Sequence, residues 1–453
     1  MSAAAQHNDL RLEISYRQIM KMAWPISFAI LVPQLNFITN NIFLGHYNSN
    51  ALAIAGITGV YYLIFAAIGY GLNNGLQALI ARRAGENRPE EIGKLFTQAI
   101  GIALGIAAVG ILLTWFVAPA ILEFSLPDEQ LRKEATTFLK IRIWGLPFLY
   151  IYQMRNALLV GTNQSRFLVA GTLAEAASNV VFDYVLIFGK WGFPELGFNG
   201  AAIASIIAEF LGMAVVFIVI HFKGIGKRFS LFSNMHYDAE RSKLILVQSS
   251  PLIFQHAISI ISWEFFYILI ARNSSVTGMA ISNTMRNIFG LFGIFSWAFA
   301  ATANAMVSNI IGQGLQERVI ELIKKIVTIS TGIALFTALL LNIFPGLFLS
   351  IYGQSELFTA EAIPVVRVVS VALVMMSFST VWLNSVTGTG NTRVNLLIEF
   401  ITIVIYSIYV YLVLERYKLS IVAGWLSEWL YWTCMFSMSY LYIKSGRWKG
   451  KVI

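Results

Sequence analysis

The chain has 453 residues and a formal net charge of +9, with 12% charged residues, 57% hydrophobic residues and a mean hydropathy of +0.69. Soluble domains carry about 25% charged residues, so this composition excludes a soluble enzyme or DNA-binding protein and indicates an integral membrane protein. The basic residues stand between apolar runs rather than in one patch, and we expect no nucleic-acid partner.

Apolar runs long enough to cross a bilayer follow one another along the chain, since the hydrocarbon core needs roughly 20 helical residues. Their residues do not alternate between apolar and polar, as the strands of an outer-membrane barrel would. The sequence therefore predicts an all-α integral membrane protein with twelve transmembrane helices. In chain order the runs are 22–44, 52–81, 95–120, 136–160, 167–189, 199–222, 247–271, 277–311, 322–350, 360–388, 394–415 and 419–443.

The two sets of six runs repeat each other. GTNQSR at 161–166 returns 227 positions later as GTGNTR at 388–393, and Gly85 and Gly105 meet Gly312 and Gly332 in the same register. An even number of spans gives both halves the same orientation, which predicts two lobes related by a pseudo-two-fold axis along the membrane normal, as in some transporters. The alternative is that duplication is simply how large membrane bundles evolve.

The repeat sets the expected domains and the topology. We expect an N-lobe at 1–222, a polar cytoplasmic linker at 223–243 and a C-lobe at 244–453. Most Lys and Arg residues fall in segments on one side of the membrane, among them the linker and the ARRAGENRPEE loop at 81–91. By the positive-inside rule, both termini are predicted to be cytoplasmic.

The fifth run carries a row of polar side chains. Glu175, Asn179 and Asp183 follow at intervals of four residues, and because a helix turns about 100° per residue they share one face. Two carboxylates with an amide between them can hold a proton or coordinate Na⁺. The alternative is a structural hydrogen-bond network between helices.

The seventh and eighth runs contribute candidates for a substrate cleft. Glu264 lies deep in its run between aromatic residues that include Trp263 and Tyr267, and aromatic rings can hold lipophilic cations by cation–π contacts. Asn283 and Arg286 are helix neighbours in the eighth run. We expect Arg286 to pair with a buried carboxylate such as Glu264.

Other polar or helix-bending residues have weaker assignments. Glu399 in the eleventh run has no acidic counterpart in the first lobe, which makes it a further cleft candidate. Glu209 and Glu428 close similar stretches in the two lobes, and this favours a structural role for both. Pro25 and Pro33 interrupt hydrogen bonding in the first run and predict either a hinge or a fixed kink.

Several stretches together resemble the multidrug and toxic compound extrusion (MATE) family of transporters. They are the proline-containing first run ending in NNIFLGHYNSNALAIAGI, the ARRAGENRPEE loop, NVVFDYVLIFG in the fifth run followed by GFPELGFNGAAIAS, and the GTGNTR turn before the eleventh run. The resemblance covers nearly the whole chain. It implies a multi-pass protein of the bacterial inner membrane that exports organic cations or other xenobiotics in exchange for H⁺ or Na⁺ by alternating access.

The resemblance also implies roles for particular residues. Asn179 and Asp183 match the first-lobe cation site of the family, and Ser205 stands where a hydroxyl ligand is usual. Asn40 stands where bacterial relatives usually have an aspartate, and Glu264 resembles the glutamate of the second-lobe motif of eukaryotic-type relatives. Glu175, on the same face as Asp183, can replace the missing carboxylate.

The coupling ion and the alternatives follow from these residues. We expect H⁺ rather than Na⁺, because Na⁺ requires several oxygen ligands held together and only three buried acids stand out. A lipid-linked oligosaccharide flippase is the first alternative, and its cleft needs cations such as Arg272, Arg286 and Arg367. A membrane-embedded enzyme is less favoured, since the sequence has no metal-binding or nucleophile motif.

No enzymatic activity, cofactor or metal other than Na⁺ is expected. The expected partners are small lipophilic molecules and the lipid bilayer, with the chain as a monomer.

Overall fold

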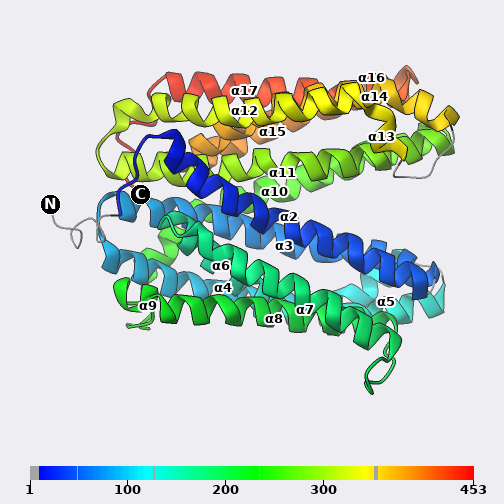
Figure 1. Ribbon diagram of the computed structural model, residues 1–453, viewed down its shortest axis with the longest axis horizontal. Coiled ribbons are helices and arrows are strands. Elements are labelled where there is room, and N and C mark those ends of the chain that lie inside the picture. The colour runs from blue at the N-terminus through cyan, green and yellow to red at the C-terminus, as the bar shows by residue number, and fades with distance from the viewer. Residues whose placement is uncertain (1–9, 48, 126–127, 234, 351–355) are drawn as a thin grey trace. The chain divides into compact units, whose positions relative to one another are not determined.

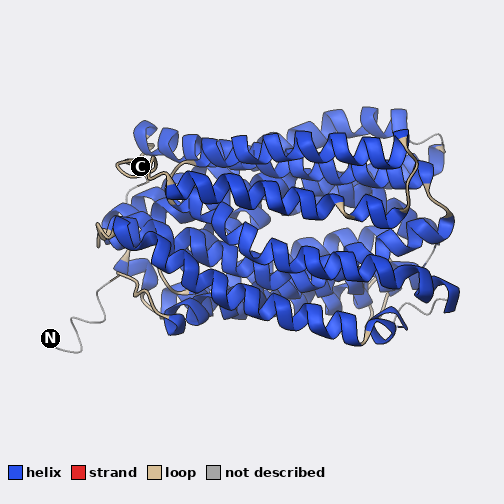
Figure 2. Ribbon diagram, turned by 90° about the horizontal axis from the view of Figure 1, so that it is seen from above, coloured by secondary structure: helices blue, strands red, loops and turns tan. Residues whose placement is uncertain are grey.

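The protein is helical throughout the part that the structure describes. The computed structural model describes residues 10–453 apart from 48, 126–127, 234 and 351–355, and every regular element in these ranges is a helix (Figures 1 and 2). Nine of the described helices are long and apolar enough to cross a membrane. The all-α membrane class is thereby confirmed, whereas the count of twelve spans stays a prediction.

Three of the predicted runs are each divided between two α-helices, and the ninth comprises α12 (Val319–Ile343) and α13 (Pro345–Ser350). The fourth is divided into α5 (Glu129–Arg142) and α6 (Leu146–Gly161) by a 3₁₀ turn at Ile143–Gly145. Pro147, in the first turn of α6, lacks the N–H that would continue the hydrogen bonds of α5. The last run is divided into α16 (Ile421–Trp425) and α17 (Ser427–Lys444).

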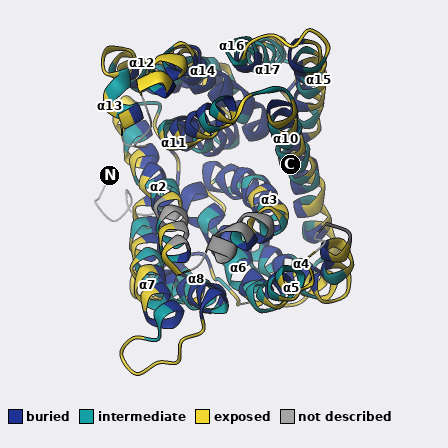
Figure 3. Cartoon of the chain, turned by 90° about the vertical axis from the view of Figure 1, so that its right-hand side faces the viewer, coloured by how far each residue is buried: buried dark blue, intermediate teal, exposed yellow. Residues whose placement is uncertain are grey.

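The chain forms two compact units. The first comprises residues 28–253, and its helices carry both buried and exposed residues (Figure 3). Its elements are the second part of α2 (Tyr16–Tyr47), α3 (Ser49–Gly85), α4 (Pro89–Ser125), α5, α6, α7 (Leu168–Phe188), α8 (Phe198–Phe222), the short α9 (Ile225–Arg228) and the start of α10 (Ala239–Asn273).

The second unit comprises residues 1–27 and 254–453. Its long buried helices are α11 and α14, which pack against each other. Its elements are the first part of α2, the rest of α10, α11 (Val276–Gly312), α12 (Val319–Ile343), α13 (Pro345–Ser350), α14 (Glu356–Gly388), α15 (Thr392–Val410) with a π-helical end at Tyr411–Arg416, α16 and α17.

The internal repeat is confirmed by the helix boundaries. α3 and α11 both have 37 residues, and both ends of α11 lie 227 positions after those of α3. α6 and α14 end at the matching glycines, Gly161 and Gly388. The repeat visible in the sequence is therefore a repeat of helical elements.

The first helix of each repeat is divided between the two units. α2 changes unit between residues 27 and 28, and α10 changes unit between residues 253 and 254, which are equivalent positions to within one residue. The compact units thus differ from the expected lobes, because residues 10–27 pack with the C-terminal helices and residues 244–253 with the N-terminal ones. The lobe boundaries and the symmetry axis stay predictions.

Polar contacts hold the segment that leads into each of these divided helices. The side-chain amide of Asn309 accepts from the N–H of Leu12 at 3.0 Å and donates to the carbonyl of Leu10 at 3.1 Å. At matching repeat positions, Lys325 donates to the carbonyl of Ile14 and Gln98 donates to the carbonyl of His236, at 3.1 and 2.8 Å. Each repeat therefore fixes the entry to the first helix of the other repeat by a side chain from its own third helix.

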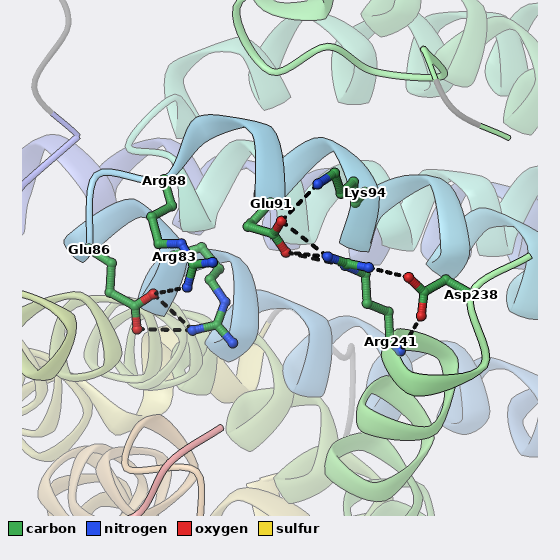
Figure 4. A network of polar contacts seen from close by, with 7 residues as sticks. All are labelled: Arg83, Glu86, Arg88, Glu91, Lys94, Asp238 and Arg241. Atoms are coloured by element: carbon green, nitrogen blue, oxygen red, sulfur yellow. Dashed lines mark hydrogen bonds and ion pairs between the residues drawn. The ribbon is translucent and has the colours of Figure 1, made fainter. Parts of the chain in front are cut away.

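An ion-pair network fixes the inter-repeat linker further (Figure 4). The Arg241 guanidinium contacts both oxygens of Glu91 on α4, with its Nη2 atom 2.9 Å from Oε2, and it also contacts Asp238. The backbone N–H of Arg241 and its guanidinium lower the pKa of Asp238 below its usual value. The start of α10 is consequently tied to α4 within the N-terminal unit.

Candidate functional site

The polar row of the fifth run lies on α7 as predicted. α7 begins after a 3₁₀ turn at Ser165–Phe167 and ends at Gly189, whose φ of +62° is readily adopted by glycine. Asn179 and Asp183 are buried on this helix, with exposures of 4% and 0%, and Glu175 is half-buried. The helix therefore carries these polar groups into the interior of the N-terminal unit.

Close packing of α7 on α8 positions Glu175. A Cβ atom on Gly212 of α8 would lie 2.8 Å from the Cβ and 3.2 Å from Oε2 of Glu175, so only glycine leaves room for this side chain. Arg155 on α6 is fully buried and donates to the carbonyls of Gly212 and Met213 on α8 at 3.1 and 3.2 Å. Arg155 also acts electrostatically on Glu175, so the acid has a cationic neighbour.

A buried ion pair lies beside this face. Arg142 at the end of α5 donates to both oxygens of Glu209 on α8, at 3.0 and 2.5 Å, and its guanidinium lies 3.9 Å from the centre of the Tyr62 ring. Arg142 also interacts electrostatically with Asp183. The N-terminal unit thus combines three acids with two buried arginines.

The arginines are the functional residues that the sequence did not single out. Their signal was available, because both Arg142 and Arg155 fall inside the fourth apolar run, where a charge is costly. Arg155 is buried against α8. The acids beside these arginines, Glu209 for Arg142 and Glu175 for Arg155, lie on other helices. Only the packing of the helices reveals these pairs.

Glu209 and Glu428 have different environments despite their similar sequence contexts. Glu209 forms the ion pair with Arg142, whereas Glu428 on α17 accepts a hydrogen bond at 3.0 Å from the indole N–H of Trp432. Position 369, which matches Arg142 in the second repeat, is a valine. The two acids are therefore not equivalent partners in a symmetric pair.

The cleft candidates of the seventh and eighth runs come together around aromatic rings in the C-terminal unit. Trp263 lies 5.9 Å from Tyr267 between ring centres, and the Arg286 guanidinium lies 5.1 Å from the centre of the Tyr267 ring. The expected ion pair is wrong, because in the described part of the chain no carboxylate lies within 4.0 Å of Arg286. Glu264 is half-buried, and Asn283 and Arg286 are exposed on α11.

Glu399 is the most fully hydrogen-bonded of the predicted acids. It is 1% exposed on α15, and one of its oxygens accepts from Ser259 at 2.6 Å and from the hydroxyl of Tyr431. Its other oxygen accepts from Gln255 at 3.2 Å. Ser259, Tyr431 and Gln255 were not predicted, since hydroxyl and amide side chains in apolar helices are common.

The remaining predicted residues are placed but not joined into a site. Asn40 on α2 and Ser205 on α8 are half-buried in the N-terminal unit. Pro25 lies within the continuous helix α2, two residues before the helix changes unit. The side chain of Pro33 lies outside the described residues. Nowhere in the described ranges do three or more His, Cys, Asp or Glu side chains form a group able to hold a metal ion.

Comparison with known proteins gives consistent matches over most of the chain. The family model described as MatE matches residues 25–185 and 251–412. A probable multidrug resistance protein NorM from Thermotoga maritima is 22% identical over 96% of this chain and 94% of its own length. The uncharacterized transporter YisQ of Bacillus subtilis is 22% identical over 83% and 82%.

Solved structures share the fold. An outward-facing multidrug resistance MATE family transporter of the MOP superfamily superposes with a TM-score of 0.88 at 16% identity, over 98% of both chains. A structure of MATE in the straight conformation gives 0.86 at 17% identity, over 98% of this chain and 99% of its own. At these identities the similarity is one of fold.

Proposed function

Because the chain belongs to the MatE family, the multidrug and toxic compound extrusion transporters, we propose that it exports lipophilic organic cations and other xenobiotics in exchange for H⁺ by alternating access. Relatives described as multidrug resistance proteins support the substrate class. We further propose a monomer in the bacterial inner membrane with both termini cytoplasmic. Its environment is the lipid bilayer, and neither nucleic acid nor a cofactor is required.

The observation that carries the proposal is the polar interior of the N-terminal unit. Asp183 is fully buried, and Glu175 lies on the same helix two turns before it. Charged groups inside a membrane are costly and typically mark ion or substrate pathways. In the proposal these carboxylates, with Asn179, Asn40 and Ser205 as further ligands, bind the coupling ion.

The arginines beside the acids favour H⁺ over Na⁺. Arg142 and Arg155 act electrostatically on Asp183 and Glu175, and a nearby positive charge opposes the binding of a second cation. A carboxylate can still accept a proton, because the proton joins it covalently and needs no further ligands. Protonation would remove the negative charge that holds a cationic drug, so drug and proton would exclude each other.

In the C-terminal unit the aromatic residues suit a lipophilic cation. Trp263 and Tyr267 lie together, and half-buried Glu264 adjoins them on α10. A flippase is less favoured, because two of its candidate cations have other neighbours. Arg272 lies 3.6 Å from Glu415, and Arg286 lies over Tyr267.

The proposal is tested by ethidium efflux in everted vesicles. A proton gradient and a sodium gradient are applied separately to wild type, Asp183→Asn and Glu264→Gln, with Glu321→Gln as an exposed control. We expect proton-driven efflux in wild type and in the control and its loss in Asp183→Asn. Absence of ion-driven efflux in wild type contradicts the antiport, and normal efflux in both Asp183→Asn and Glu264→Gln contradicts the site.

A further inference from the structure

The C-terminal unit contains a second polar centre that the first repeat lacks. Glu399 lies between α10, α15 and α17, and its three hydrogen-bond partners are Gln255, Ser259 and Tyr431. All three partners are neutral. A fully buried carboxylate whose partners carry no charge has no cation to balance it, which distinguishes Glu399 from the paired Glu209.

The internal repeat shows that the fold does not require this polarity. The positions 227 residues before Gln255, Ser259 and Glu399 are Phe28, Val32 and Thr172. Those three residues line a cavity of about 150 Å³ in the N-terminal unit, completed by Val169 and Leu173. The same place in the fold is therefore mainly apolar in one repeat and holds a carboxylate in the other.

Structural need does not account for that carboxylate. Burying a charge is costly unless it is both hydrogen-bonded and paired with an opposite charge, and the matching positions of the first repeat carry no charge. Two further positions of the first repeat are also apolar. Tyr431 matches Ala204, and Asn395, which donates to Gln255, matches Leu168. We infer that Glu399, Ser259, Tyr431 and Gln255 form a second proton-binding site, one that lies in the C-terminal unit and is not the repeat equivalent of the α7 acids.

The direction of the hydrogen bonds favours a proton over a metal ion. Asn395 donates to Oε1 of Gln255 at 2.6 Å, which turns the Gln255 NH₂ group toward Glu399 at 3.2 Å. An NH₂ group pointing at the carboxylate supports the anion and repels a bound cation. Asn395 is thus a positioning residue that acts through Gln255.

The same groups satisfy the protonated acid. With the acid ionised, the hydroxyls of Ser259 and Tyr431 both donate to one carboxylate oxygen. When the acid is protonated, its O–H donates to the Ser259 oxygen, and the Ser259 hydroxyl turns to a backbone carbonyl of the preceding helical turn, as serine does in helices. Either state leaves the carboxyl group of Glu399 and its three partners hydrogen-bonded.

Other ionisable groups lie along the packed helices. On α10 they are His256, next to Gln255, then Glu264, Tyr267 and Arg272 farther along, and Glu240, Arg241 and Lys243 at its start. On α17 Glu428 acts electrostatically on Tyr431, and the helix also carries Cys434, Tyr440, Tyr442 and Lys444. α15 itself carries Arg393, Tyr406 and Tyr409. On α14, which also packs against α15, they are Glu356, Glu361 and Arg367, all in its first half.

Infrared difference spectroscopy of the full-length protein in lipid tests the site without drug or gradient. Spectra at acidic and alkaline pH report the carbonyl band of each buried carboxyl group that exchanges a proton. We expect Glu399→Gln and Glu399→Thr, the residue of the first repeat, to lose one such band that Asp183→Asn retains. Ser259→Ala and Tyr431→Phe should shift that band, because each removes one hydrogen bond; they also preserve the test if the Glu399 variants do not fold.

Three results would overturn the inference. They are an unchanged set of bands in folded Glu399→Gln, no shift in either hydroxyl variant, and a band that responds to Na⁺ at constant pH. The role of the proton in transport rests on the proposed antiport, but proton binding itself does not. If vesicles show no ion-driven efflux while the Glu399 band titrates, the antiport proposal fails and the Glu399 site stands. If efflux is proton-driven and no band depends on Glu399, the antiport proposal stands and the Glu399 site fails.

Discussion

The buried pair of Arg142 and Glu209 offers a quantitative test of the N-terminal unit. Its two hydrogen bonds measure 3.0 and 2.5 Å, and the two side chains are only 12% and 9% exposed. We consider Arg142→Met and Glu209→Gln, singly and together. Each single change leaves one ion of the pair buried without its partner.

The structure sets the expected magnitude. At an effective dielectric constant of about 20, charges about 3 Å apart attract by about 5 kcal/mol, and the desolvation of both ions offsets much of this. Removing one partner of a buried pair costs about 3–5 kcal/mol of unfolding free energy. Glu209→Gln should lie at or below the lower end, because Arg142 keeps its cation–π contact with Tyr62. The double variant should lose less than the sum of the two, by about 2–3 kcal/mol.

The assay is unfolding in mixed micelles of increasing SDS content, followed by a thiol-reactive dye on Cys434, the single cysteine of the chain. The exposed pair of Arg318 and Glu321 is the matched control, and Arg318→Met should cost less than about 1 kcal/mol. Two results would refute the argument that burial makes this pair strongly coupled. One is a loss of unfolding free energy in the double variant that equals the sum of the single losses. The other is a single loss no larger than that of Arg318→Met.

The remaining predictions concern packing and the attachment of the divided helices. Gly212→Ala should destabilise the protein by about 1–3 kcal/mol, because the new Cβ atom would lie 2.8 Å from the Cβ of Glu175. The control Gly105→Ala, whose new Cβ would have no atom within 4 Å, should not destabilise the protein in the same SDS titration. Arg241→Ala should cost about 1 kcal/mol and make the linker easier to cleave by protease, with a smaller difference from wild type at high salt; equal cleavage at low salt would contradict this. Asn309→Leu should cost about 2–4 kcal/mol, since two backbone groups of the N-terminal segment lose their partner, and hydrogen exchange at the N–H of residue 12 should accelerate.

The sequence alone determined those features that depend on local patterns. Hydropathy identified the membrane class, and matching glycines identified a repeat whose helix ends coincide with the boundaries of α3 and α11. The spacing of Glu175, Asn179 and Asp183 placed them on one helix face, which the structure confirms. Helical periodicity and apolar length are properties of a single segment, so no knowledge of its neighbours is needed.

Only the tertiary structure decided which groups meet. Glu209 finds Arg142 at a sequence distance of 67 residues, and Glu399 finds Gln255, Ser259 and Tyr431 on two other helices. The pairing of Arg286 with Glu264 looked equally reasonable in the sequence, but Arg286 lies over an aromatic ring instead. A sequence shows which side chains share a helix face. Which helix covers that face depends on the rotation and packing of the whole unit, and this decides whether a buried charge has a partner.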